Sequence, residues 1–136
     1  MPGPAPTNVS SDTTLPSAAD VVVIGGGIIG VCTALELAER GQSVVLLEKG
    51  EIGAEQSSRN WGWVRISRRD PREIPLMIEA IRAWEGMDAR TGRNTGYVQG
   101  GILFTAANEK TFGQYDRWTE NLTAHQMECR MVVGHE

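Results

Sequence analysis

The stretch that decides the fold runs from Asp20 to Glu48 and reads DVVVIGGGIIGVCTALELAERGQSVVLLE. Its β-branched apolar run, residues 21–24, lies directly before a glycine cluster and is typical of a strand buried on both faces. Residues 28–40 have the spacing of a helix that ends at Gly41, where glycine takes a positive φ at low steric cost. A second buried strand is predicted over residues 43–47. Strand, helix and strand within about 30 residues predict a right-handed, parallel βαβ unit.

The glycines between the first strand and the helix follow the spacing of a dinucleotide-binding fingerprint. Gly25 permits a tight turn, Gly27 lets the backbone approach a pyrophosphate, and Gly30 lets the helix pack closely on the strands. The helix begins at Ile28 and Ile29, where free N–H groups and a partial positive charge favour phosphate. We therefore expect these five residues to contact a dinucleotide. A structural glycine turn in an unrelated α/β protein is the alternative.

Glu48 ends the second predicted strand, 18 residues after Gly30. A carboxylate at this place can accept hydrogen bonds from the hydroxyls of an adenosine ribose. The same negative charge disfavours a 2′-phosphate, which argues against NADP. The fingerprint alone leaves FAD and NAD as alternatives.

The composition is that of an ordinary globular chain. The 136 residues are 40% hydrophobic and 22% charged, with 13 basic and 17 acidic side chains and a net charge of −4. These values exclude a disordered chain, a collagen-like repeat and a disulfide scaffold, and they argue against a general nucleic-acid binder. The longest apolar run, residues 21–31, is roughly half as long as a membrane-spanning helix requires. No transmembrane segment is therefore expected.

Cys32 and Cys129 lie far apart in the sequence and lack the spacing of metal ligands, so we expect free thiols and no metal site. Residues 1–19 are rich in proline, serine and threonine and lack the charged and apolar regions of a secretory signal. We interpret them as a flexible tail. Together these features predict a cytoplasmic protein.

The second half of the chain predicts a loop followed by helices and a strand. Residues 54–69 are polar and rich in arginine, which is typical of a functional loop. Asp70 is expected to cap a helix that continues to about Ala89 and ends at Gly92. Residues 97–106 predict a straight or bent strand, and Asn108 is expected to cap a last helix.

The segment after the second strand carries a family resemblance. Glu48 and Lys49, followed by Gly-Ala-Glu-Gln-Ser-Ser-Arg-Asn at residues 53–60, resemble the FAD-dependent D-amino-acid oxidase superfamily, which includes the glycine and sarcosine oxidases and the D-amino-acid dehydrogenases. The resemblance covers residues 20–101 and implies FAD as the cofactor. It also implies that this loop lies along the pyrophosphate and ribityl chain, with contacts from Lys49, Gln56, Ser57, Ser58, Arg59 and Asn60.

A sharper match covers residues 58–68 and 72–76, which are similar to a segment of the sarcosine oxidases. The resemblance implies that Arg65 lies against the flavin and that Arg68 helps to hold a substrate carboxylate. A planar guanidinium suits the second role because it can bind a carboxylate through two parallel hydrogen bonds. A solvated basic face around a helix start is the alternative, and we prefer it for Arg69 and Arg72.

The resemblance implies an oxidoreductase that removes a hydride from the carbon beside a substrate amine to flavin N5, and water then hydrolyses the imine. The expected substrate is a small amine or amino acid. The expected fold class is α/β, with a Rossmann-like βαβ FAD-binding unit that forms the N-terminal part of a doubly wound parallel sheet. Residues 20–95 would form this unit with its flavin loop and following helix. Residues 96–136 would begin an α+β substrate domain.

Two other functions remain open. One is part of an NAD-linked dehydrogenase that uses the same βαβ unit, and the other is a non-catalytic cofactor-binding piece of a multi-chain enzyme. A doubly wound fold binds its dinucleotide between two halves, and this chain supplies about one of them. We therefore expect a further segment, on this chain or on another, to complete the enzyme.

Overall fold

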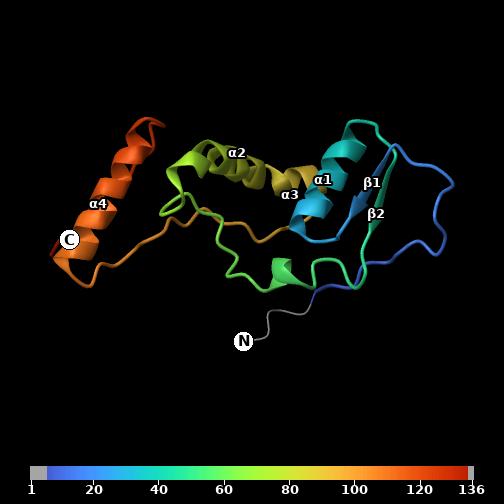
Figure 1. The fold of residues 1–136 in the computed structure, drawn as a ribbon, viewed down its shortest axis with the longest axis horizontal. Coiled ribbons are helices and arrows are strands. Elements are labelled where there is room, and N and C mark those ends of the chain that lie inside the picture. Colours follow the sequence, from blue (N-terminus) through green and yellow to red (C-terminus); the bar gives the residue numbers. More distant parts are fainter. Residues whose placement is uncertain (1–5, 135–136) are drawn as a thin grey trace. The chain divides into compact units, whose positions relative to one another are not determined.

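Two parallel strands and a crossover helix form the first part of the structure, a computed structural model that describes residues 6–134. Strand β1 (Val21–Ile24) pairs with β2 (Val44–Leu47), with Val21 opposite Val44 and Ile24 opposite Leu47. Helix α1 (Ile28–Glu39) connects them and packs on both (Figure 1). The predicted βαβ unit is therefore confirmed.

Helix α1 ends as its sequence predicts. Gly41 has a φ of 80° and donates from its N–H to the carbonyl of Ala38 at 2.9 Å, while Gln42 donates to Leu37 at 3.1 Å. This pair of bonds is a Schellman motif, which satisfies two carbonyls of the last helical turn. After this turn the chain continues directly into β2.

The prediction that both strands are buried on both faces is wrong. Along β1 the side chains alternate, and Val22 and Ile24 are 54% and 86% exposed, whereas Val21 and Val23 are half-buried. The cause is that α1 is the only α-helix within residues 6–63, and a single crossover helix covers a single face of a sheet.

By its internal contacts the chain divides into two units, of which the first ends at Trp63 and the second begins at Val64. The division lies inside the predicted arginine-rich loop. Residues 6–19, the described part of the predicted tail, contain no helix or strand, and the rest of that tail lies outside the described residues. Cys32 and Cys129 are free thiols.

The predicted helix after Asp70 begins where expected but is interrupted. Asp70 accepts a hydrogen bond from the N–H of Arg72 at 3.0 Å and starts the 3-10 turn η2 (Pro71–Glu73). Helix α2 (Ile74–Glu85) follows and stops at Gly86, and α3 (Met87–Thr91) ends at Gly92, whose φ is 65°. Glycine weakens helix interiors, which accounts for the break at Gly86.

The strand predicted over residues 97–106 is wrong, because these residues are irregular. A strand requires a partner to take up its backbone hydrogen bonds, and the described residues of the second unit offer it none. Gly101, with a φ of 73°, also interrupts the extended conformation. Helix α4 (Glu109–Thr123) does form, and the Asn108 side chain caps it by accepting from Thr111 N–H at 2.9 Å.

A small core holds the second unit together. Ile66, Ile74 and Leu122 are its buried residues, and Ile74 is fully inaccessible. Half-buried side chains from α2, from α4 and from the segment after it pack against this cluster: Met77, Ile78, Ile81, Trp118 and Met127. The core therefore joins the arginine-rich loop, through Ile66, to the helices that follow it.

Candidate functional site

The glycine turn of the first unit leaves backbone donors free at the start of α1. Gly25 has a φ of 108° and donates to the Leu47 carbonyl at 2.7 Å, which ties the turn to β2. Gly27 is the N-cap and has no side chain to satisfy the first turn. Within residues 6–134 the N–H groups of Ile29 and Gly30 meet no protein acceptor. Such a terminus suits an anionic ligand.

Two glycines of the turn are required by their surroundings. A Cβ on Gly30 would lie 1.8 Å from the carbonyl oxygen of Gly25, so only glycine allows α1 to approach β1 this closely. A Cβ on Gly27 would lie 3.1 Å from the Ser57 hydroxyl, in the space beside the helix start. The two positions have the packing and approach roles that the fingerprint assigns to them.

Gly26 is a residue that the sequence reasoning did not include. It is buried, and a Cβ there would lie 2.4 Å from Cδ1 of Ile52 and 3.1 Å from Cβ of Glu48. The run of three consecutive glycines was the signal for this residue. The G-x-G pattern allows any residue at its middle position, and this chain has glycine there as well.

Glu48 lies at the carboxyl end of β2 and contacts the glycine turn directly. Its carboxylate accepts hydrogen bonds from the N–H of Gly26 at 2.6 Å and of Gly50 at 2.9 Å. The Gly26 bond first and the Gly50 bond second hold the pKa of Glu48 below its ordinary value. An ionised carboxylate has about four acceptor sites, so two bonds leave capacity for ribose hydroxyls.

The lowered pKa of Glu48 makes a prediction about acid stability. Its two hydrogen bonds stabilise the fold fully above the pKa of an unfolded glutamate, about 4.3, and this contribution is lost as the pH falls through the lower folded value. We expect the unfolding midpoint of Glu48→Gln to fall less steeply than that of the wild type below about pH 5. Urea titrations across that range provide the measurement. Glu51→Gln, which removes a charge nearby, is the control, and identical slopes for wild type and Glu48→Gln would contradict the expectation.

The loop after β2 returns to the start of α1. The short turn η1 (Gln56–Ser58) presents the Ser57 hydroxyl, which accepts from Ile28 N–H at 2.8 Å. The Asn60 side chain then fixes the loop by donating to the Ser57 carbonyl at 2.6 Å and accepting from Gly62 N–H. The structure therefore brings the two predicted cofactor segments together around one helix terminus.

Five other predicted cofactor residues make fewer contacts in this unit. The Ser58 hydroxyl donates to the carbonyl of Ala54 at 3.1 Å, which stabilises the turn. The side chains of Ile29, Lys49, Gln56 and Arg59 are exposed. Trp61 and Trp63 are also exposed and meet edge to face at 5.2 Å, so they neither fill the core nor line a described cavity of this unit.

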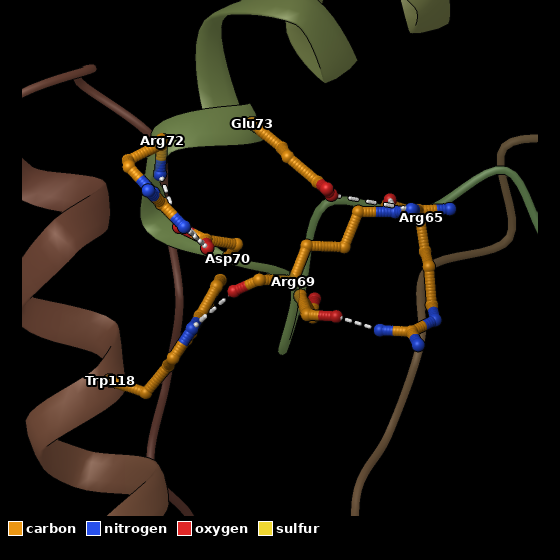
Figure 2. Close-up of polar contacts among 7 residues, drawn as sticks. Arg65, Arg69, Asp70, Arg72, Glu73 and Trp118 are labelled. Carbon is orange, nitrogen blue, oxygen red and sulfur yellow. Dashed lines mark hydrogen bonds and ion pairs between the residues drawn. The ribbon is translucent and has the colours of Figure 1, made fainter.

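The two arginines predicted for catalysis belong to the second unit and differ from their neighbours in having no carboxylate partner within residues 6–134. Figure 2 shows the neighbours: Arg72 is paired with Asp70, and Arg69 reaches Glu73 at 3.5 Å. These ion pairs support the interpretation of Arg69 and Arg72 as a local basic face. The Arg72 bond also lowers the pKa of Asp70.

Backbone contacts hold the arginine loop in place. The Arg65 guanidinium donates to the Ser67 carbonyl, and Arg69 Nε donates to the Arg65 carbonyl at 3.0 Å. The Trp118 indole of α4 donates to the Arg69 carbonyl at 2.9 Å (Figure 2). Arg68 has a φ of 60°, a left-handed conformation that is uncommon outside glycine.

Arg68 lines a cavity of about 480 Å³ within the second unit. Aromatic side chains from the irregular segment and from α4 form much of its wall: Phe104, Phe112, Tyr115 and Trp118. The sequence reasoning missed these residues as neighbours of Arg68, because 36 positions or more separate them from it. Among the described residues no group of three or more histidine, cysteine or acidic side chains could hold a metal ion, and no helix could cross a membrane.

A comparison with protein families decides which dinucleotide this site takes. Residues 20–136 match the model of a family described as FAD dependent oxidoreductase. The chain belongs to this family. The family confirms FAD, rather than NAD, as the cofactor, and the Rossmann-like α/β unit agrees with it.

Individual relatives agree with the family assignment. Human mitochondrial sarcosine dehydrogenase is 36% identical over 124 residues, which cover 90% of this chain and 14% of the relative. Glycine oxidase of Geobacillus kaustophilus is 33% identical over 134 residues, which cover 84% of this chain and 36% of the oxidase. The solved structure of an L-amino acid deaminase from Proteus myxofaciens, in complex with anthranilate, superposes with a TM-score of 0.83 at 38% identity. The match covers 89% of this chain and 27% of the deaminase chain. The chain therefore spans between a seventh and about a third of these relatives.

Proposed function

We propose that the protein is the FAD-binding N-terminal portion of a flavoenzyme that oxidises a carbon–nitrogen bond of an amino acid or secondary amine. The observation that carries the proposal is the start of α1 in a chain of an FAD-dependent family: two N–H groups there meet no acceptor within residues 6–134, and the N–H of Gly26 just before them binds the Glu48 carboxylate. The sarcosine, glycine and L-amino acid enzymes among its relatives support the substrate class.

The residues of the first unit fit an FAD dinucleotide. The N–H groups at the start of α1 would hold the pyrophosphate, and Glu48 would hold the adenosine ribose. The polar loop would line the rest of the cofactor. The proposed binding set is Gly25, Gly27, Ile28, Ile29, Gly30, Glu48, Lys49, Gln56, Ser57, Ser58, Arg59 and Asn60. FAD, when bound, supplies the two-electron oxidation of the substrate.

The arginine loop at the start of the second unit would bind and orient the substrate. We assign Arg68 to the substrate carboxylate, since its guanidinium is unpaired within the described residues and borders a cavity. Arg65, also without a carboxylate partner there, would place a positive charge beside the cofactor, where it favours an anionic reduced state. We assign residues 20–95 to the cofactor module and residues 96–136 to the beginning of a substrate domain.

Flavin content tests the proposal. The purified protein should carry, or take up on addition of FAD, a chromophore with the visible absorption of an oxidised flavin. Titration with NAD under the same conditions is the matched comparison. Binding of NAD without any uptake of FAD would overturn the proposal in favour of an NAD-linked dehydrogenase.

Arg68→Ala is expected to raise KM for a carboxylate substrate about 10- to 100-fold, because a charge-assisted bidentate pair contributes roughly 1.5–3 kcal/mol. Flavin content should stay unchanged. Arg72→Ala, which removes an arginine already paired with Asp70, is the control and should leave KM near the wild-type value. Loss of flavin in Arg68→Ala would instead move this residue into the cofactor site.

A second candidate function follows from one particular relative. The mitochondrial pyruvate dehydrogenase phosphatase regulatory subunit of the mouse is 31% identical over 96 residues, covering 70% of this chain. The alternative is therefore a protein that binds a cofactor without turnover. Reduction of bound flavin by sarcosine, glycine or an L-amino acid, followed anaerobically, would exclude this alternative.

We also propose that a further segment, on this or another polypeptide, completes a doubly wound sheet. The exposed face of β1, with Val22 and Ile24, supports this, because parallel sheets are normally covered on both faces. Native mass spectrometry of the purified material would detect a second chain or a longer one. Cytoplasmic location remains part of the proposal, and cell fractionation tests it against the mitochondrial location in the names of several relatives.

A further inference from the structure

The guanidinium of Arg68 rests against two aromatic rings. Its Cζ atom lies 4.5 Å from the ring centroid of Tyr115 and 5.1 Å from that of Phe104. The two rings meet each other at 6.3 Å with an interplanar angle of 62°. All three distances lie within the range of cation–π and edge-to-face contacts. The irregular segment that contains Phe104 and the helix α4 that contains Tyr115 therefore both contact the positive charge of Arg68.

The two rings contact this charge directly and limit where it can lie. Arg68 forms no ion pair within residues 6–134, and its backbone has a left-handed φ of 60° that a residue with a Cβ rarely adopts. A long, exposed side chain on such a backbone would otherwise sample many rotamers. Contact with two half-buried rings restricts it to a few.

Arg65 shares one of these rings but is held differently. Its Cζ lies 5.8 Å from the Phe104 centroid, and its guanidinium already donates to the Ser67 carbonyl. Within residues 6–134 the Arg68 guanidinium forms no comparable hydrogen bond, so aromatic contact has the larger share in its placement. Phe104 contacts both arginines, whereas Tyr115 contacts Arg68 and, within the described residues, not Arg65.

We propose that Phe104 and Tyr115 are positioning residues, which hold the Arg68 guanidinium in the orientation that receives the substrate carboxylate. The proposal rests on the proposed function, because it assumes that Arg68 binds this carboxylate. Ring contact suits this role, since a cation–π contact attracts the charge without using its N–H donors in hydrogen bonds, which leaves them available for a bidentate pair with a carboxylate. The two rings therefore orient the charge without neutralising it.

The test uses anthranilate as the carboxylate probe and aniline as the same ring without the carboxylate. Each is titrated into the oxidised holoenzyme, and the change in visible flavin absorbance gives Kd. We expect Tyr115→Leu and Phe104→Leu each to raise Kd for anthranilate about fivefold, the size of one exposed cation–π contact, and to leave Kd for aniline unchanged. Tyr115→Phe, which keeps the ring, should restore wild-type binding.

Two further variants separate positioning from general packing. Tyr97→Leu alters an aromatic residue of the same unit that stacks on Trp84 at 6.0 Å, outside the lining of this cavity and without contacting an arginine within the described residues, and it should leave both Kd values unchanged. In the double variant Arg68→Ala/Tyr115→Leu, the loss of anthranilate binding should equal that of Arg68→Ala alone, because Tyr115 acts only through Arg68.

The outcomes distinguish this inference from the proposed function. If Arg68→Ala weakens anthranilate binding and Tyr115→Leu does not, or if the two losses add in the double variant, the positioning role is overturned and the carboxylate role stands. If Arg68→Ala leaves anthranilate binding unchanged, or if the wild type binds anthranilate no better than aniline, both are overturned.

Discussion

Replacing Gly30 by alanine is expected to destabilise the first unit by about 3 kcal/mol and to abolish flavin binding, although it adds a single methyl group. The added Cβ would lie 1.8 Å from the Gly25 carbonyl oxygen and 3.1 Å from its carbon, and both are backbone atoms that cannot rotate away. Helix α1 must therefore shift from β1. That shift would displace the free N–H groups of the helix start.

Urea unfolding and flavin content are the measurements for this variant. Gly113→Ala is the matched control, because Gly113 lies within α4 and its Cβ would meet only Nη1 of Arg117, at 3.6 Å. Alanine there should stabilise the helix by about 0.5–1 kcal/mol. If Gly30→Ala kept the stability and the flavin of the wild type, the close helix–strand approach described above would be wrong.

Replacing Ile74 by alanine is expected to destabilise the second unit by about 3 kcal/mol. Ile74 is 0% exposed and lies at the centre of the core with Ile66 and Leu122, so its truncation would leave a cavity. Ile66 immediately follows Arg65 and comes two residues before Arg68. Loosening its packing should therefore also raise KM for a carboxylate substrate.

Leu76→Ala provides the control from the same helix. Leu76 is 70% exposed, and its truncation should change the free energy of unfolding by less than about 0.5 kcal/mol and leave KM unchanged. Comparison of the two variants by urea unfolding and by steady-state kinetics separates core packing from a general effect on α2. Equal stability of the two variants would contradict the assignment of Ile74 to the core.

Features encoded in neighbouring residues were predicted well. The glycine turn, the helix end at Gly41 and the caps at Asp70 and Asn108 each depend on a side chain or a backbone angle within a few positions. The parallel pairing of β1 with β2 followed as well, since a short crossover through a helix leaves few other arrangements. The FAD family was indicated by resemblance and is confirmed by the match over residues 20–136.

Features that depend on distant partners were predicted poorly. The sequence pattern of residues 97–106 is that of a strand, but a strand forms only where another strand accepts its hydrogen bonds. The apolar character of β1 predicted two buried faces, while burial depends on how many helices pack against the sheet. No local pattern linked Arg68 to Tyr115, which lies 47 positions later.

The sequence by itself determined the βαβ unit, the glycine turn with Glu48 at the end of β2, and the family to which the chain belongs, because these are set by local backbone chemistry at fixed spacing. Only the tertiary structure decided how these groups are used. It placed the Ser57 hydroxyl against the first N–H of α1 and bound the Glu48 carboxylate to the N–H of the buried Gly26. It paired Arg69 and Arg72 with carboxylates, and it placed Arg65 and Arg68 against aromatic rings. The physical reason is that hydrogen bonds and ring contacts depend on distance in space, which separation along the chain does not reveal.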